Sequence, residues 1–185
     1  MQVAPLPKNE FTRAQALRAT NILDTTSDIR FDLITRCASH WFNAPICAVS
    51  LIDTNRQWFK SVYGINISEA PRNISMCAHA INEVTSHIPA ERIFEINNTV
   101  IDFRFVDNPY VIQSPGIRSY ISFVIQSQTG ENIGTFCVVD TRPRIFDTQE
   151  KRLLISLGQM LENLIHTYTC YSLTHPNHAA PSQQP

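Results

Sequence analysis

The chain has almost no net charge, with 15 Lys and Arg residues against 16 Asp and Glu residues in 185, and it carries no basic run. Without a positive field, neither a nucleic acid nor an anionic membrane is an expected partner. No apolar stretch approaches the ~18 residues that a membrane-spanning helix needs. The N-terminus also lacks the basic and apolar regions of a secretion signal. We therefore expect a cytoplasmic protein without membrane insertion.

Paired cysteines and phosphate-binding loops are also missing. The five cysteines, at positions 37, 47, 77, 137 and 170, lie in apolar segments, and no CxxC pair occurs. Such usage is typical of buried thiols in a reducing compartment rather than of a disulfide framework. No glycine-rich loop of the GxGxxG or GxxxxGK type is present, so the sequence gives no sign of a nucleotide phosphate site. We expect no metal and no cofactor.

The composition, with 43% hydrophobic and 17% charged residues, is sufficient for one globular domain with a sizeable core. We place this domain at residues 9–170. Residues 1–8 are rich in proline and are expected to be flexible. Residues 171–185 contain almost no apolar side chains, so burial cannot offset the entropy of ordering them, and a disordered tail is expected.

Apolar periodicity predicts helices over residues 9–21, 28–42, 74–84 and 147–168. The last is the best marked, because Asp147 and Glu150 have the spacing of a capping box, in which each side chain accepts a hydrogen bond from the other residue's backbone amide. Residues 102–112 are expected to form a short helix or an ordered loop.

Runs of β-forming residues predict strands at 46–52, 56–63, 93–96, 120–126 and 133–139. The first is almost continuously apolar, as expected for a central strand buried on both faces. Two pairs of runs are separated by turn signals and are expected to form hairpins. The simplest fold is α+β, with one antiparallel sheet of five or six strands and helices on both faces.

Three groups of bulky and polar residues follow one another between the apolar run at 46–52 and the second hairpin: 56–60, 75–80 and 102–110. In this order they resemble the GAF domain, the small-molecule sensing module of signalling proteins. The likeness is closest to the GAF domains that precede bacterial histidine kinase and diguanylate cyclase modules. It implies the α/β sandwich of GAF and PAS domains, with a ligand pocket under a helix and a loop.

Trp58 and Phe59 are the first candidate ligand residues. Because neighbouring residues on a strand face opposite sides, one should pack in the core and the other should line the pocket.

Cys77 and His79 are the second pair of candidates. Thiolate and imidazole are ordinary zinc ligands and ordinary partners in covalent catalysis. On a helix, however, side chains two residues apart point about 200° apart, which argues against a shared metal ion. A buried thiol and a ligand-contacting histidine are the alternatives, and the resemblance implies that this segment covers the pocket.

Asp102, Arg104 and Phe105 belong to the third group, and Arg118 and Tyr120 are further candidates by their place in the resemblance. Arg104 either forms a structural ion pair with Asp102 that fixes a loop over the pocket, or binds an anionic ligand group.

Two ligand classes of related domains are not expected. Residues 114–119 contain no cysteine where photoreceptor GAF domains attach a bilin, and no NKFDE-type motif of cyclic-nucleotide-binding GAF domains is present.

The last helix carries Leu153, Leu157, Met160 and Leu164 beside a second apolar row. The combined face is wider than contact with a sheet requires. It indicates either a broad core-facing stripe or a partner helix, and we expect a homodimer through these residues.

The resulting hypothesis is a sensory or regulatory GAF domain without catalytic activity. It binds an unidentified small molecule and signals through its terminal helices to a partner or to an attached kinase or cyclase output module. One alternative is a GAF-fold reductase of free methionine sulfoxide that acts through Cys77 and Cys137. The other is a ligand-free dimerisation scaffold, which a small and fully packed interior would distinguish.

Overall fold

The computed structural model describes the backbone of residues 1–174 and the side chains of residues 1–168. Its elements follow one another in the order α1 (Glu10–Ala19), α2 (Ile29–Phe42), β1 (Ile46–Ile52), β2 (Arg56–Tyr63), β3 (Glu69–Pro71), α3 (Met76–Glu83), β4 (Ile93–Ile96), α4 (Pro109–Ile112), β5 (Ser119–Gln126), β6 (Asn132–Asp140) and α5 (Thr148–Thr174). Short 3₁₀ turns at Arg72–Ile74 and Pro89–Glu91 precede α3 and β4.

The strands form one six-stranded sheet in the order β3-β2-β1-β6-β5-β4. Every neighbouring pair is antiparallel. All residues of β1 and β5 are buried, because helices cover both faces of the sheet. The expected α+β architecture is therefore confirmed.

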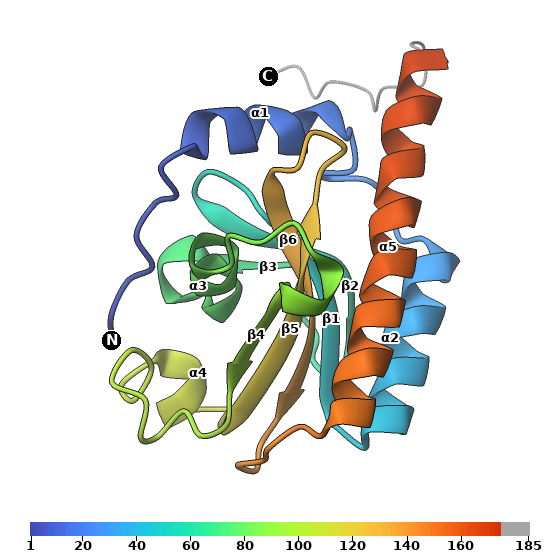
Figure 1. Cartoon of the computed structure of the whole chain (residues 1–185). Coiled ribbons are helices and arrows are strands. Elements are labelled where there is room, and N and C mark those ends of the chain that lie inside the picture. The colour runs from blue at the N-terminus through green and yellow to red at the C-terminus, as the bar shows by residue number, and fades with distance from the viewer. Residues whose placement is uncertain (175–185) are drawn as a thin grey trace.

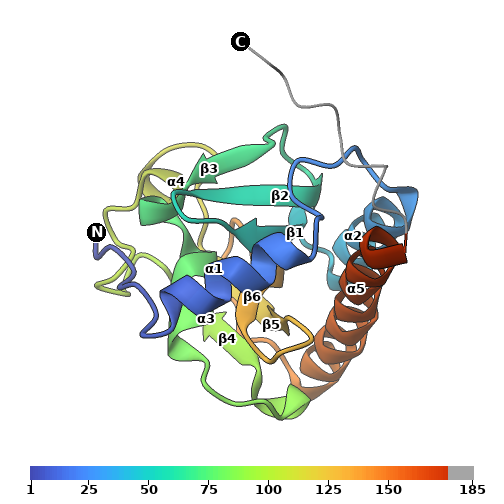
Figure 2. The same ribbon diagram turned by 90° about the horizontal axis from the view of Figure 1, so that it is seen from above.

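The helices form two layers around the sheet (Figure 1). On one face, α2 and α5 cover a core that includes Phe31, Phe123 and Leu161. On the other face, α3 and the segment around α4 cover a second core that includes Phe105 and Val124. Seen from above, α1 crosses one end of the sheet and leaves both faces to the other helices (Figure 2).

Helix α5 begins with the expected capping box. The Asp147 amide donates to Glu150 Oε2 and the Glu150 amide donates to Asp147 Oδ1, each at 2.8 Å. Farther along the helix, a Cβ at Gly158 would lie 2.2 Å from the Phe123 ring, so glycine lets α5 lie directly on β5. The helix continues to Thr174, beyond its expected end at 168. Of the expected disordered tail, residues 171–174 belong to α5, and 175–185 lie outside the described residues.

The N-terminal segment runs along α3 and the loop before α4. The Gln2 amide donates to the Arg104 carbonyl at 3.0 Å, the Gln2 carbonyl lies 3.0 Å from His79 Nε2, and the terminal ammonium pairs with Asp107. The flexibility expected for residues 1–8 stays a prediction.

Some boundaries differ from those expected from sequence. Strand β3 was not predicted, because three residues that end in Pro71 are too short to show a period. Helix α3 starts at Met76 instead of 74, because the Ser75 side chain caps it by accepting from the Ala78 amide. The 102–112 segment is mostly turns, with only Pro109–Ile112 helical.

A buried ion-pair network fixes α1 to the sheet. Glu10 accepts from Arg13 at 2.8 and 2.9 Å and from Arg72 at 2.6 and 2.9 Å. Arg13 also donates to the Ile52 carbonyl at 2.6 Å, and Arg72 donates to the Asp53 carbonyl at 3.1 Å. Burial raises the pKa of Glu10, but the hydrogen bonds from Arg72 and Arg13 outweigh burial and lower the pKa to about 2.

Glu10→Gln is expected to lower the free energy of unfolding by roughly 2 kcal/mol at pH 7, because it leaves two buried guanidinium groups without their carboxylate. A carboxyl group whose pKa is lowered by folding stabilises the folded state at pH values above its pKa in the unfolded chain. This contribution is lost as the pH falls from about 4.5 towards 2. Urea denaturation followed by circular dichroism should therefore show the deficit shrinking from pH 7 to pH 3. Exposed Glu91→Gln is the control, and a Glu10→Gln deficit independent of pH would contradict the network's role.

Candidate functional site

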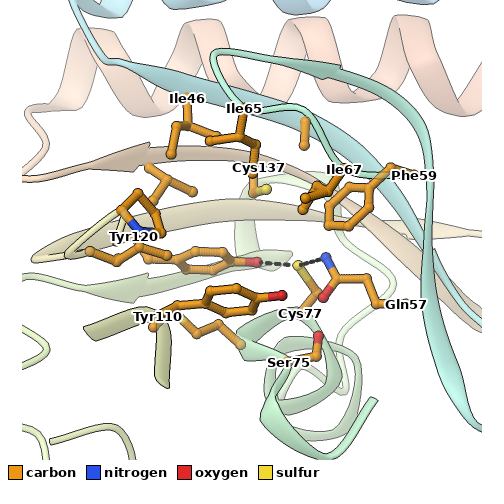
Figure 3. A pocket seen from close by; sticks show the side chains of 15 residues that line it. Ile46, Gln57, Phe59, Ile65, Ile67, Ser75, Cys77, Tyr110, Tyr120 and Cys137 are labelled. Carbon is orange, nitrogen blue, oxygen red and sulfur yellow. Dashed lines mark hydrogen bonds between the residues drawn. The ribbon is translucent and has the colours of Figure 1, made fainter. Parts of the chain in front are cut away.

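A small cavity lies between the sheet and the start of α3. Its volume is about 60 Å³, well below the roughly 300–1,000 Å³ of pockets for drug-sized ligands. Apolar side chains dominate the lining, which comprises Ile46, Ala48, Gln57, Phe59, Ile65, Ile67, Ser75, Met76, Cys77, Tyr110, Pro115, Ile117, Tyr120, Cys137 and Val139. Figure 3 shows these side chains.

The Cys77 sulfur is the polar centre of this cavity. Cys77 is the second residue of α3, and the helix places its side chain under the sheet. The Gln57 side-chain amide and the Tyr120 hydroxyl each donate to Cys77 Sγ at 3.1 Å, and Figure 3 shows the two donors on opposite sides of the sulfur. The cavity therefore holds a thiol with fixed donors from β2 and β5.

Side chains of the central strands also favour the ionised form of Cys77. Hydrogen bonding from Cys137, Ser50 and Thr135 lowers the pKa of the Cys77 thiol. Burial raises the pKa of the Cys77 thiol, but these hydrogen bonds outweigh burial and lower the pKa below its ordinary value. The hydrogen bond to Cys77 and burial raise the pKa of Cys137 instead. Of the two thiols, Cys77 is the one that ionises first.

Three of the nine candidate ligand residues line the cavity: Phe59, Cys77 and Tyr120. Trp58 lies on the opposite face of the sheet, in the core under α2 and α5. The expectation that Trp58 and Phe59 face opposite sides is confirmed, and Phe59 is the residue at the cavity.

His79 and Phe105 lie outside the cavity. The two rings meet edge to face with centroids 4.8 Å apart, and His79 also lies 3.4 Å from Glu83. Cys77 points into the cavity while His79 points towards the N-terminal segment, so the expected divergence of these two side chains is confirmed.

Arg104 pairs with two carboxylates and does not face the cavity. Its guanidinium lies 2.7 Å from Asp102 and 2.8 Å from Glu83 and stacks over the Phe94 and Phe105 rings. The structural ion pair is the alternative that the geometry supports. It ties the loop before α4 to the end of α3.

Arg118 acts on the neighbouring loop. Its guanidinium donates to the carbonyls of Val111 and Ile117 at 2.8 and 3.0 Å, which holds the segment between α4 and β5. Arg118 and the Arg104 pair therefore fix the loops around the cavity rather than line it.

Gln57 and Tyr110 line the cavity but were not among the sequence candidates. Gln57 belongs to the group at 56–60, and strand alternation places it on the same face as Phe59, so its role was readable from that strand. Tyr110 belongs to the group at 102–110, but no strand alternation there indicated which way its side chain points. Cys137 was predicted only as part of the reductase alternative, and the tertiary structure brings it to Cys77.

The expected dimer residues form a side stripe on α5. Leu154, Leu161 and Ile165 face the core and are fully buried. Leu153, Leu157 and Leu164 pack only partly against it, and Met160 is 53% exposed. The stripe is thus partly free for a partner, and the dimer stays a prediction.

Within the described part of the chain, no helix has the length and apolar character to cross a membrane. In the same residues, no three His, Cys, Asp or Glu side chains gather closely enough to hold a metal ion.

Similarity to known proteins agrees with the fold. Over 144 residues the chain is 35% identical to a cyclic di-GMP phosphodiesterase of Pseudomonas aeruginosa. The match covers 78% of this chain but only 23% of that protein. The chain thus spans less than a quarter of the curated relative.

Two solved structures share the fold at low sequence identity. The GAF domain of an Acinetobacter phosphoenolpyruvate-protein phosphotransferase superposes with a TM-score of 0.59 at 14% identity, over 90% of this chain and 98% of that one. Free methionine-R-sulfoxide reductase from Neisseria meningitidis, in complex with its substrate, gives 0.60 at 15% identity, over 93% and 99%.

The family model of the GAF domain matches residues 28–165. This range runs from the cap of α2 into α5 and includes all six strands and the cavity. The chain therefore belongs to the GAF domain family.

Proposed function

We propose that this chain is a non-catalytic regulatory GAF module of a cyclic di-GMP signalling protein. The state of its cavity is transmitted through the sheet to α5 and from there to an output module. The relative from Pseudomonas aeruginosa supports the signalling context, since most of its length lies outside the match. The observation that carries the proposal is a β-bulge in β2 that connects the cavity to α5.

The bulge lies at Lys60. Ser50 of β1 pairs with Phe59, whereas the preceding Val49 pairs with Ser61, so Lys60 has no partner in the ladder. Such an extra residue bends the strand locally. Phe59 faces the cavity, and Lys60 extends to the other face. One short backbone segment therefore carries a cavity residue and a residue of the helix layer.

Lys60 is held in a closed environment below α5. Its ammonium donates to Thr25 Oγ1 at 2.8 Å and to the Thr26 carbonyl at 2.7 Å. It also lies over the rings of Phe31 and Tyr168, 5.6 and 5.0 Å from their centroids. Burial lowers the pKa of Lys60, so the charge depends on these contacts for its stabilisation.

Tyr168 links this environment to both helices. Its hydroxyl donates to Asp28 Oδ2 at 2.6 Å, and Asp28 caps α2 by accepting from the Arg30 amide at 3.0 Å. A shift of Phe59 that displaces Lys60 would alter the packing of Tyr168 and the position of α5. Terminal helices are thus the expected output of this module.

The cavity restricts the input. At about 60 Å³ it suits a guest of a few heavy atoms or a chemical change in its own side chains. The same size weakens the reductase alternative, because methionine sulfoxide would require the loops to open. A ligand-free scaffold is the remaining alternative, which the small interior favours and the cavity's buried polar centre disfavours.

The proposed transmission from Phe59 through Lys60 to Tyr168 of α5 is tested by a double-mutant cycle. The cycle combines Phe59→Leu with Tyr168→Phe, and stability is measured by urea denaturation. We expect a coupling of at least about 0.5 kcal/mol despite the intervening sheet, since both residues act through Lys60. In a Lys60→Met background the coupling should disappear. The matched control pairs Phe59→Leu with Ile165→Val and should be additive. Additivity of the first pair would refute transmission through the bulge.

The dimer is tested by native mass spectrometry of the purified chain, which also reports any co-purified small molecule. We expect a dimer that Met160→Lys disrupts. Dimerisation would bury the new ammonium group in an apolar interface without an opposite charge to compensate it. Gln159→Lys, on another side of the same helix, is the control and should remain dimeric. A monomeric parent protein, or a dimer unaffected by Met160→Lys, would exclude α5 as the interface.

A further inference from the structure

The base of the cavity brings two thiols together from distant parts of the chain. Cys77 lies at the start of α3, and Cys137 lies in the middle of β6, between Ala48 of β1 and Ser122 of β5. Both residues are buried and both line the cavity. Hydrogen bonding between the two thiols lowers the pKa of Cys77 and raises that of Cys137. Cys47, the third buried thiol among the side chains that the structure describes, lies on the opposite face of the sheet.

The groups around Cys77 are arranged for a thiolate. A neutral thiol is a weak hydrogen-bond acceptor, yet the amide of Gln57 and the hydroxyl of Tyr120 both donate to this sulfur at 3.1 Å. Hydrogen bonding from Ser50, Thr135 and Cys137 also lowers the pKa of Cys77. The N-terminus of α3 contributes its positive dipole end, which also favours a thiolate. Donors converging on one sulfur stabilise negative charge there.

The cavity selects what reaches this sulfur. Its lining is mostly apolar and its volume is about 60 Å³, so charged or bulky molecules are excluded by desolvation and size. Phe59, Ile65, Ile67, Tyr110 and Pro115 are only partly buried, which places the rim of the cavity at the surface. A small uncharged oxidant can pass this rim.

We propose that the cavity is a peroxide-reactive site, in which hydrogen peroxide oxidises Cys77 and Cys137 to a disulfide. The chemistry stands on the cavity and the thiol pair alone. Its signalling consequence rests on the function proposed above, for which it supplies the input.

The Cys77 thiolate attacks one peroxide oxygen, so that an S–O bond forms and the O–O bond breaks. The departing hydroxide takes up the proton that the Cys77 thiol released, which gives Cys77 sulfenic acid and one water. The Cys137 sulfur then attacks the Cys77 sulfur, the S–O bond breaks, and the hydroxyl leaves with the Cys137 proton as a second water. Overall, two thiols and one hydrogen peroxide yield one disulfide and two waters.

The disulfide would change the hydrogen bonding between Cys77 and Gln57 of β2. Gln57 donates to the thiolate and lies two residues before Phe59, on the same face of the strand. Once the sulfur is neutral and bonded to Cys137, Gln57 loses a charged acceptor and Cys77 is tied to β6. Both changes act next to the Lys60 bulge.

The test uses the full chain with Cys37→Ser and Cys170→Ser, which removes the exposed Cys37 and a cysteine whose side chain lies outside the described residues. After treatment with hydrogen peroxide at a small molar excess, peptide mass spectrometry under non-reducing conditions should find a Cys77–Cys137 linkage. Cys77→Ser and Cys137→Ser should each abolish it, and Cys47→Ser should not. Thermal unfolding of each variant, followed by circular dichroism, verifies that it folds. Cys77→Ala replaces Cys77→Ser if the latter does not fold.

An intact dithiol after treatment, or oxidation of Cys47 at a rate equal to that of Cys77, would overturn the proposal. Hydrogen exchange of α5 in the oxidised and reduced chains separates the two hypotheses. A disulfide with altered α5 exchange supports both of them. A disulfide with unchanged exchange supports the reactive site and contradicts the regulatory function.

The pH dependence of oxidation gives an independent prediction. Because only the thiolate reacts, the oxidation rate should rise with pH and level off above the pKa of Cys77. This plateau should begin at a lower pH than for a cysteine with an ordinary pKa. Tyr120→Phe removes a donor and should raise that pKa, moving the plateau to higher pH and slowing oxidation about tenfold at pH 7. Tyr110→Phe, which also alters the cavity wall, is the control. A Tyr120→Phe profile identical to the parent's would contradict thiolate stabilisation by Tyr120.

Discussion

The interaction on which the functional interpretation depends is the placement of the Lys60 ammonium beneath α5. A buried cation must be satisfied, and here two oxygens and two aromatic rings satisfy it. Because Lys60 is the extra residue of a bulge next to Phe59, the two faces of the sheet are linked through one peptide unit. A regular strand would also alternate its faces, but its ladder hydrogen bonds would resist the local bending that the bulge allows.

The sheet has polar groups buried on both sides, around Lys60 on one side and around Cys77 on the other. On one side the ammonium of Lys60 binds the segment before α2 and the end of α5. On the other side Gln57 of β2 and Tyr120 of β5 donate to the sulfur of Cys77. Both sites adjoin apolar core clusters, so a change of charge at either one is costly. This contrast is the physical basis for treating them as the input and the relay of a regulatory module.

The polar residues expected to contact a ligand act mainly as supports of the surrounding loops. Arg104 is compensated by Asp102 and Glu83, and Arg118 is occupied by loop carbonyls. Neither guanidinium lines the cavity, so neither is placed to bind an anion there. Hence the cavity is left with weakly polar and apolar walls, and its chemistry is that of sulfur rather than of ionic recognition.

The sequence by itself determined the order and type of nearly all elements, the antiparallel α+β architecture and the capping box of α5, because these depend on local periodicity and short-range hydrogen bonds. It also indicated that Phe59 and Trp58 face opposite ways. Only the tertiary structure decided that Trp58 is the core residue, that His79 and Arg104 turn away from the cavity, and that Cys77 meets Cys137. Such outcomes depend on strand register and on which helix covers which face, and contacts between residues 60 positions apart leave no periodic trace in the chain.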